Sequence, residues 1–190
     1  GSVVASFVDA GRLRCVSPSA LDAGTGAFVD IDFSAPSTTL TLPSAPPSDE
    51  PLIANGFLQL TSADFEQSAT ALVILSHDSR RPVSFEATFD VWFGWTGGEA
   101  VAFCFGRLAR SFISEHGVEE GFCVSFMDHL LLSWVTYNGT RVGPERSLAG
   151  QLEYGSWVPV RMLWLTSGTL DVRFNGVLTH EVLLPTSDAT

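Results

Sequence analysis

The sequence predicts an all-β protein, an antiparallel β-sandwich, from three observations. Short strands with apolar or alternating patterns recur along the chain, turn-forming residues separate them, and no long stretch shows a helical period of apolar residues. Each of the three asparagines also precedes a glycine, and Asn-Gly is the strongest short hairpin signal because both residues tolerate a positive φ. These pairs are Asn55-Gly56, Asn138-Gly139 and Asn175-Gly176.

The charge of the chain argues against two classes of partner. Among its 190 residues 21 are acidic and ten are basic, all ten being Arg, so the formal net charge is −11. Nucleic acids and bare anionic membrane surfaces bind clustered positive charge, and we expect neither as a partner. No apolar run approaches the roughly 18 residues of a membrane span, so direct membrane insertion is not expected either.

Residues 1–36 contain a short series of strand and turn motifs. An apolar strand at residues 5–8 is followed by a polar turn, by a Leu-x-Cys-x-Ser-Pro element at residues 13–18, and by a last strand at residues 27–33. The series resembles the C-terminal half of an IPT/TIG (immunoglobulin-like, plexin and transcription factor) domain. The resemblance implies that Cys15 is either free or paired with a cysteine in a first half of the domain upstream of this chain.

Residues 37–51 differ in composition from what surrounds them. They are rich in Ser, Thr and Pro, which predicts a linker or an extended crossing strand. We therefore expect a second module over residues 52–185, followed by a short tail at residues 186–190.

The strands of this second module carry the strongest patterns. In "VSFEATFDVWF", residues 83–93, apolar side chains alternate with mostly polar ones, which predicts a half-buried strand whose phenylalanines face a core. Asn175-Gly176 lies between "TLDVRF" and "VLTHEVLL" and predicts a hairpin. Further strands are expected at "GFLQL", "ALVIL", "AVAFCF", "GFCVSF", "LLLSWV" and "WVPVRMLWL".

Several of these motifs together resemble the concanavalin A-like lectin/glucanase superfamily, whose fold is a jelly-roll sandwich. They are "SFEATFDVWF", "GGEAVAFCFG", "EEGFCVSFMDH", "WVPVRMLWL" and "LDVRFNG". Legume-type relatives carry a sugar-binding Asp where this chain has Glu99, and metal-binding carboxylates where it has Ser125 to Met127. Asp128 comes one position late, which on a strand turns a side chain to the other face. We therefore expect no metal site and no other cofactor.

Trp95 and Glu99 form the candidate ligand-binding site, with Asp128 as a third candidate. Trp95 falls in the turn "GWTGG" beside Glu99, and aromatic rings stack on the apolar faces of sugars. The alternative is that Trp95 packs and Glu99 is a solvated turn residue. Trp92 takes the outward phase of its strand, and packing roles are expected for Trp134, Trp157 and Trp164.

Cys104 and Cys123 lie on two strands that are expected to pair. The phenylalanines beside them should face the core, so both cysteines should point to the opposite face, where a disulfide can form if the Cα atoms are close enough. In an oxidising compartment we expect this disulfide, and the alternative is two free thiols.

The sequence also contains one N-glycosylation sequon and four histidines. Asn138-Gly139-Thr140 is an N-glycosylation sequon in a predicted turn, where a glycan has room. The four histidines, His77, His116, His129 and His180, lack metal-ligand spacing and form no Ser-His-Asp motif. The paired carboxylates of a glycosidase strand are absent as well.

The sequence therefore favours a non-catalytic module of a large extracellular or cell-surface protein. Its expected role is adhesion or structural assembly, with neighbouring domains or subunits as partners. The alternative is a calcium-independent carbohydrate-binding domain that uses Glu99 and Trp95, and a glycoside hydrolase is a third interpretation. A binding site should be open to solvent, whereas an assembly surface should be covered by a neighbour.

Overall fold

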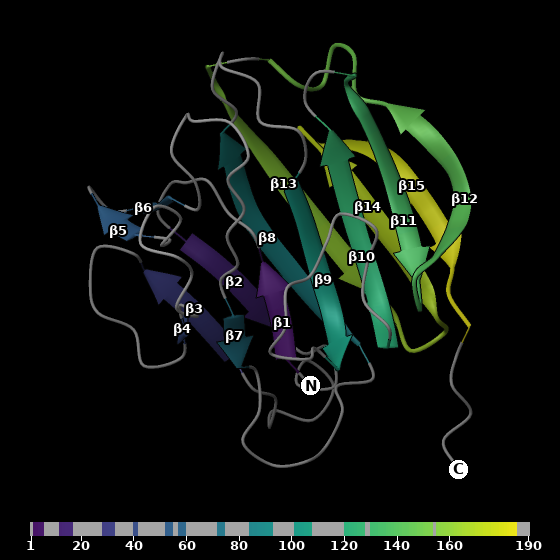
Figure 1. The fold of residues 1–190 in the computed structure, drawn as a ribbon, viewed down its shortest axis with the longest axis horizontal. Helices are drawn as coiled ribbons and strands as arrows, with labels where there is room; N and C mark the ends of the chain where they lie inside the picture. The colour runs from purple at the N-terminus through teal and green to yellow at the C-terminus, as the bar shows by residue number, and fades with distance from the viewer. Residues whose placement is uncertain are drawn as a thin grey trace.

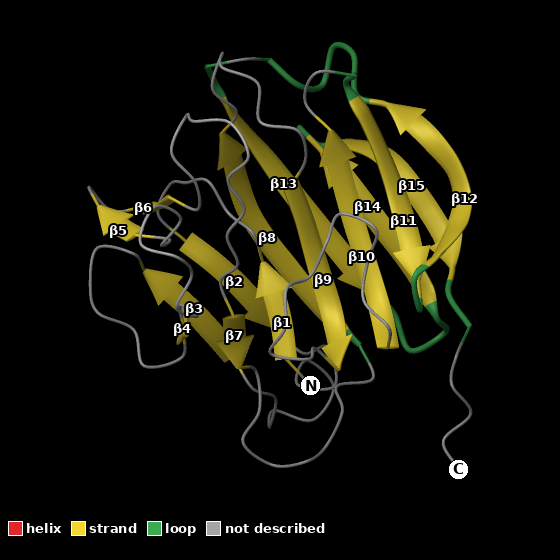
Figure 2. Cartoon of the chain, viewed as in Figure 1, coloured by secondary structure: helices red, strands yellow, loops and turns green. Residues whose placement is uncertain are grey.

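The structure of the chain is a computed structural model. It describes residues 84–92, 101–107, 120–127, 130–153 and 155–185, together with the backbone of seven short strands between residues 2 and 74. Every regular element among these residues is a β-strand (Figure 2), and all strand pairs are antiparallel. The all-β, sandwich-like prediction is confirmed at this level.

Two large sheets contain nearly all described strands (Figure 1). Sheet A has seven strands in the spatial order β12 (Thr140–Ser147), β11 (Leu132–Tyr137), β10 (Glu120–Met127), β9 (Val101–Arg107), β1 (Ser2–Ala5), β7 (Leu72–Ile74) and β4 (Leu40–Thr41). Sheet B has six in the order β15 (Val177–Leu183), β14 (Thr169–Phe174), β13 (Trp157–Trp164), β8 (Phe85–Trp92), β2 (Arg12–Val16) and β3 (Phe28–Asp32). A separate hairpin joins β5 (Leu52–Ala54) to β6 (Phe57–Gln59).

The three strands of the IPT/TIG-like segment join these same sheets. Strand β1 lies between β9 and β7 in sheet A, whereas β2 pairs with β8 and β3 in sheet B. Strand β4, which falls within the predicted linker, pairs with β7. The predicted boundary between two modules stays a prediction, and the described strands from both sides of it hydrogen-bond to one another.

Strand β8 shows how the alternating pattern builds the core. The side chains of Phe85, Ala87, Phe89 and Val91 are at most 5% exposed, while the intervening side chains are only half-buried. The period of two seen in the sequence therefore separates a core face from an outward face, as predicted.

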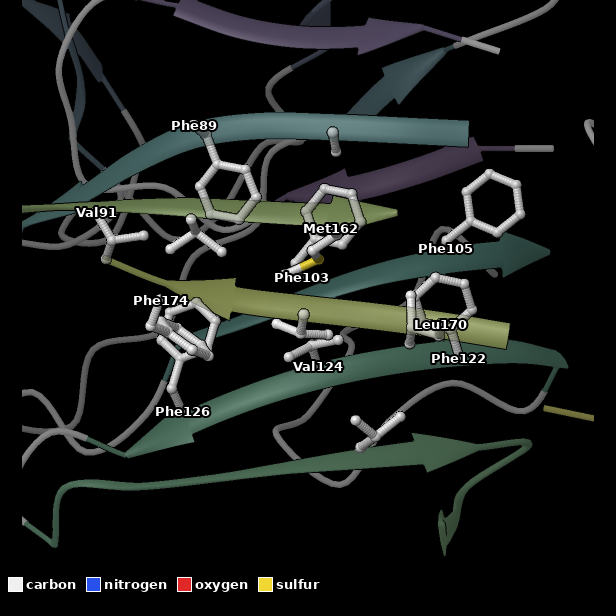
Figure 3. Close-up of a cluster of buried hydrophobic side chains, with 14 of the residues drawn as sticks. Phe89, Val91, Phe103, Phe105, Phe122, Val124, Phe126, Met162, Leu170 and Phe174 are labelled. Atoms are coloured by element: carbon white, nitrogen blue, oxygen red, sulfur yellow. The ribbon is translucent and has the colours of Figure 1, made fainter. Parts of the chain in front are cut away.

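The core lies between β8, β13 and β14 on one side and β9 and β10 on the other. Figure 3 shows phenylalanines of both sheets pointing toward one another. The ring of Phe85 has its centroid 4.6 Å from that of Phe105, and Phe89 lies 5.5 Å from Phe103. Burying each such ring stabilises the fold by about 1.5–3 kcal/mol, so this aromatic cluster is the main contact between the sheets.

Both Asn-Gly turns in the described part have the predicted backbone. Asn138 and Gly139 have φ angles of 48° and 71°, and Asn175 and Gly176 have 49° and 79°. Two successive positive φ angles define the type I′ turn that fits the twist of a hairpin. The strands around each turn pair, β11 with β12 and β14 with β15, which confirms both hairpins.

Strands β12 and β15 are the neighbouring edges of the two sheets (Figure 1). The contact is close at Gly143, where an added Cβ would lie 3.1 Å from Cγ1 of Val182. Apart from the Asn138-Gly139 turn, nothing in the sequence indicates strand β12, because its sequence "TRVGPERS" is polar and contains Pro144. Proline is tolerated on an edge strand, where its missing N–H leaves no ladder bond broken.

Candidate ligand-binding face

The three ligand-binding candidates from the sequence, Trp95, Glu99 and Asp128, lie outside the described residues. So do His77, His116 and His129. Their proposed contact with a ligand stays a prediction. The surface described below consists of residues with described positions.

Cys104 and Cys123 are cross-strand partners on β9 and β10 and are joined by a disulfide. Their Cα atoms are 4.1 Å apart, and both side chains are fully buried. The neighbouring phenylalanines on the same strands face the core, so the disulfide lies on the outward face of sheet A. Ser125, Trp134 and Thr136 share this face, and each is at most 5% exposed.

Asn138 lies exposed in the turn between β11 and β12. Its Oδ1 accepts a hydrogen bond from the backbone N–H of Gly121 at 2.8 Å, and its own N–H donates to the Gly121 carbonyl oxygen at 2.7 Å. The side-chain oxygen is thus engaged while the residue remains at the surface. Occupancy of the sequon stays a prediction.

His180 lies on β15 and is only 2% exposed. Its Nε2 is 2.9 Å from Oγ of Ser133, so the pair connects the edge strand β15 of sheet B to β11, the second strand of sheet A. Burial, with the nearby Arg146 as a second cause, lowers the pKa of His180 to about 4. Among the described residues, Ser133 and Arg146 are the polar partners of the imidazole, and neither is the orienting carboxylate of a Ser-His-Asp triad.

On the outward face of sheet B, the side chains of β8, β13 and β14 are half-buried or exposed, and several of them are polar or charged. Register pairs Trp92 with Trp157, Asp90 with Pro159, and Thr88 with Arg161 across β8 and β13. These pairs form three successive rows along the strands. The second and third rows enclose a groove of about 590 Å³, whose lining includes Asp90, Arg161 and Arg173.

Arg161 is held in place at this groove by Glu86. The Nε of Arg161 donates a hydrogen bond to Oε1 of Glu86 at 2.7 Å, across β13 and β8. This bond and the carboxylate charge raise the pKa of Arg161. Because Nε is taken, the terminal nitrogens of the guanidinium remain as donors on this face.

Asp90 lies on β8 between the tryptophans and Thr88 and has a half-buried side chain. Its burial raises its pKa above the usual range, because removal from water disfavours the charged form. A carboxyl group in this position is an acceptor for hydroxyl groups of a ligand.

Trp92 and Trp157 form an aromatic pair in the row next to Asp90 and Pro159, which line the groove. Their ring centroids are 6.0 Å apart with planes inclined by 38°, and Trp157 is 40% exposed. The sequence assigned Trp157 to packing, whereas its side chain contacts Trp92 and still faces solvent. The missed signal is the alternation in "WVPVRML", where Trp157, Pro159 and Arg161 alternate with buried residues. Trp134, at 5% exposed, and Trp164, packed on the core, match the packing assignment.

Metal and membrane features are absent from the part of the chain that the structure describes. Within it, no three His, Cys, Asp or Glu side chains come together as a metal site would require. Nor does any described helix have the length and hydropathy to cross a membrane. Comparison with protein-family models, curated proteins and solved structures found no match. The function is therefore inferred from the arrangement of the described residues.

Proposed function

We propose that this chain is a non-catalytic recognition module that binds a saccharide on the outward face of sheet B without calcium. The observation that carries the proposal is the Trp92–Trp157 pair, in which Trp157 is 40% exposed, one row along the strands from a groove lined by Thr88, Asp90 and Arg161. Sugars present apolar faces that pack on aromatic rings and hydroxyl groups that need hydrogen-bond partners. The two rings supply the first contact, and Asp90, Thr88 and Arg161 supply the second.

The carboxylates of this face argue for binding rather than hydrolysis. A glycosidase needs two carboxyl groups within roughly 5–10 Å across the scissile bond. Among the described residues that line the groove, Asp90 is the only acidic one. Glu86 lies four residues from Asp90 on the same strand, which corresponds to about 13 Å. Glu86 is also engaged by Arg161.

The proposal includes a lineage and a location. We place the chain with the concanavalin A-like jelly-roll sandwiches, preceded by an IPT/TIG-like segment, in an extracellular or cell-surface protein. The sequence motifs support this lineage, and the buried Cys104–Cys123 disulfide supports an oxidising compartment, where such bonds persist. Adhesion through a glycan is the biological role that these features favour together.

A glycan-array experiment on the full chain, with and without a calcium chelator, tests the proposal. We expect binding that the chelator does not change and that Trp157→Ala abolishes, because the variant removes the exposed ring. Leu130→Ala is the matched control, since it removes an exposed apolar side chain, 55% accessible, from the turn between β10 and β11. No binding by the folded chain, or binding that Trp157→Ala leaves intact, contradicts the proposal.

A second function, structural assembly, is favoured by the edge strand β15. Val177, Leu178 and Leu183 on this strand are 51%, 40% and 70% exposed. Exposed apolar residues on an unpaired sheet edge are typical of contacts with a neighbouring chain. Sedimentation of the full chain at increasing concentration tests this function. Association that Leu183→Asp abolishes supports it, and a concentration-independent monomer contradicts contact between copies.

A further inference from the structure

Three arginines lie in one transverse row of sheet B. Backbone register pairs Arg14 on β2 with Thr88 on β8, Thr88 with Arg161 on β13, and Arg161 with Arg173 on β14. Neighbouring strands are about 4.8 Å apart, so the row extends over about 14 Å of the sheet. Thr88, Arg161 and Arg173 line the groove of the proposed saccharide site.

This row is unusual in a chain of this composition. The protein has ten arginines and no lysine against 21 acidic residues, yet three of the ten occupy this single row. Arg161 and Arg173 are direct cross-strand partners, and like charges at such positions destabilise a sheet. A ligand that neutralises the row would relieve this repulsion.

Within the described residues, Arg161 has an acidic partner and Arg173 has none. Glu86 engages Nε of Arg161. For Arg173 the described contact is a hydrogen bond from Nη1 to the Gly176 carbonyl oxygen at 3.3 Å, and no described acidic side chain forms an ion pair with it. Its guanidinium therefore faces the groove with its charge uncompensated at contact distance.

We propose that Arg161 and Arg173 make the site selective for an acidic oligosaccharide, whose anionic group lies over these two guanidinium groups. This inference rests on the saccharide-binding function proposed above. A guanidinium donates two parallel hydrogen bonds to a carboxylate or a sulfate, and such charge-assisted bonds are stronger than neutral ones. The same sugar chain would extend past Asp90 to the Trp92–Trp157 pair, which lies about 13 Å along β8 from Thr88.

Calorimetric titration of the full chain with four probes tests this inference. The probes are a short oligogalacturonate, its carboxyl-reduced neutral counterpart, a sulfated oligosaccharide of similar length, and an oligoglutamate peptide. We expect an acidic oligosaccharide to bind at least about tenfold more tightly than the neutral one, because a hydrogen-bonded charge pair is lost in the latter. The carboxylated and sulfated probes distinguish the two sources of negative charge.

Arg173→Gln is the deciding variant, with Arg161→Gln as a second. Each should reduce the affinity for the acidic probe about tenfold, and Arg173→Gln should leave the affinity for the neutral probe unchanged. Arg161→Gln should also weaken binding of the neutral probe, because Arg161 is a proposed hydrogen-bond partner of the sugar hydroxyl groups. The matched control is Arg141→Gln on β12, which removes the same charge from another arginine that is paired with a glutamate, Glu145. Circular dichroism of each variant verifies that it is folded.

The possible results separate the inference from the function on which it rests. Equal binding of neutral and acidic probes, with no effect of Arg173→Gln, overturns the inference and leaves saccharide binding standing. Preferential binding of oligoglutamate, lost in Arg173→Gln, overturns it in favour of an acidic protein segment. Binding of none of the saccharides overturns the inference and the proposed function together.

Discussion

The outward faces of sheets A and B have the same strand alternation but differ in burial. On sheet A the outward side chains of Cys104, Cys123 and Trp134 are at most 5% exposed. On sheet B the outward side chains of β8 are half-buried, and Trp157 is 40% exposed. The alternating sequence pattern therefore predicts which side chains point away from the core. It does not predict which of these outward side chains are exposed to solvent.

The difference also separates two uses of the same residue types. Trp134 and Arg141 contact each other on sheet A, with the guanidinium 5.2 Å from the ring centroid, and Trp134 is buried there. Trp157 and Arg161 lie on one strand of sheet B, where the Trp157 ring is 40% exposed and Arg161 lines a groove. The first pair stabilises the fold, whereas the second is suited to a ligand.

The largest expected effect on stability is that of truncating Trp134, and truncating Trp157 provides the comparison. Trp134→Ala should lower the free energy of unfolding by about 3–5 kcal/mol, because it empties a buried site. Trp157→Ala should lower it by about 1 kcal/mol or less, because the ring is partly solvated and loses mainly its contact with Trp92. Chemical denaturation measures both values. Equal costs would contradict the contrast between the two faces.

The disulfide should contribute the next largest effect. It closes a loop with a sequence separation of 19, and Cys104→Ala/Cys123→Ala should cost about 3 kcal/mol through the gain in unfolded-chain entropy. Cys15→Ala is the control, since it removes a cysteine and leaves the pair intact. The denaturation midpoints of the parent, the double variant and Cys15→Ala measure this cost. An unchanged midpoint for the double variant would contradict a stabilising role for the disulfide.

His180 should make stability depend on pH at the edge where the two sheets meet. The folded pKa of about 4 lies below the ordinary value of 6.5, so the neutral form is the one that folding favours. Its contribution is complete above pH 6.5 and declines as the pH falls toward 4, by at most about 3 kcal/mol. Stability curves of the parent and His180→Gln should converge over this window, and parallel curves would contradict a buried neutral imidazole.

The smallest effect is expected at the open face of sheet B. Asp171 and Glu181 are direct cross-strand partners on β14 and β15, and like charges in that position destabilise a sheet. Glu181→Lys should therefore raise the free energy of unfolding by about 0.2–1 kcal/mol. Glu153→Lys, an equal charge change in an exposed position outside the strands, is the control. An equal gain in both variants would assign the effect to net charge.

Much of the fold could be predicted from periodicity and turns. The core face of β8 and the hairpins at Asn138 and Asn175 follow from local rules that hold in any sandwich. The sequence of β12 itself has no strand pattern, because this polar strand is stabilised by pairing with β11 rather than by burial, and only the Asn138-Gly139 turn indicated it. The domain boundary expected at residues 37–51 stays a prediction.

The candidate site was harder to predict because it depends on register between distant strands. Arg14, Arg161 and Arg173 are far apart in the sequence, and nothing local indicates that pairing places them in one row. Trp157 was assigned to packing because a tryptophan in a sandwich usually packs, and its exposure depends on which sheet face is open. Both facts require the three-dimensional arrangement.

The most direct test of the account is to follow the indole N–H resonances of the five tryptophans by NMR during titration with an acidic oligosaccharide. We predict that the signals of Trp92 and Trp157 shift together with a common saturation curve, while that of Trp134 stays in place. Assignment by single Trp→Phe variants makes the comparison unambiguous. Shifts confined to Trp95, or to none of the five, would contradict the account that the open face of sheet B is the ligand-binding surface.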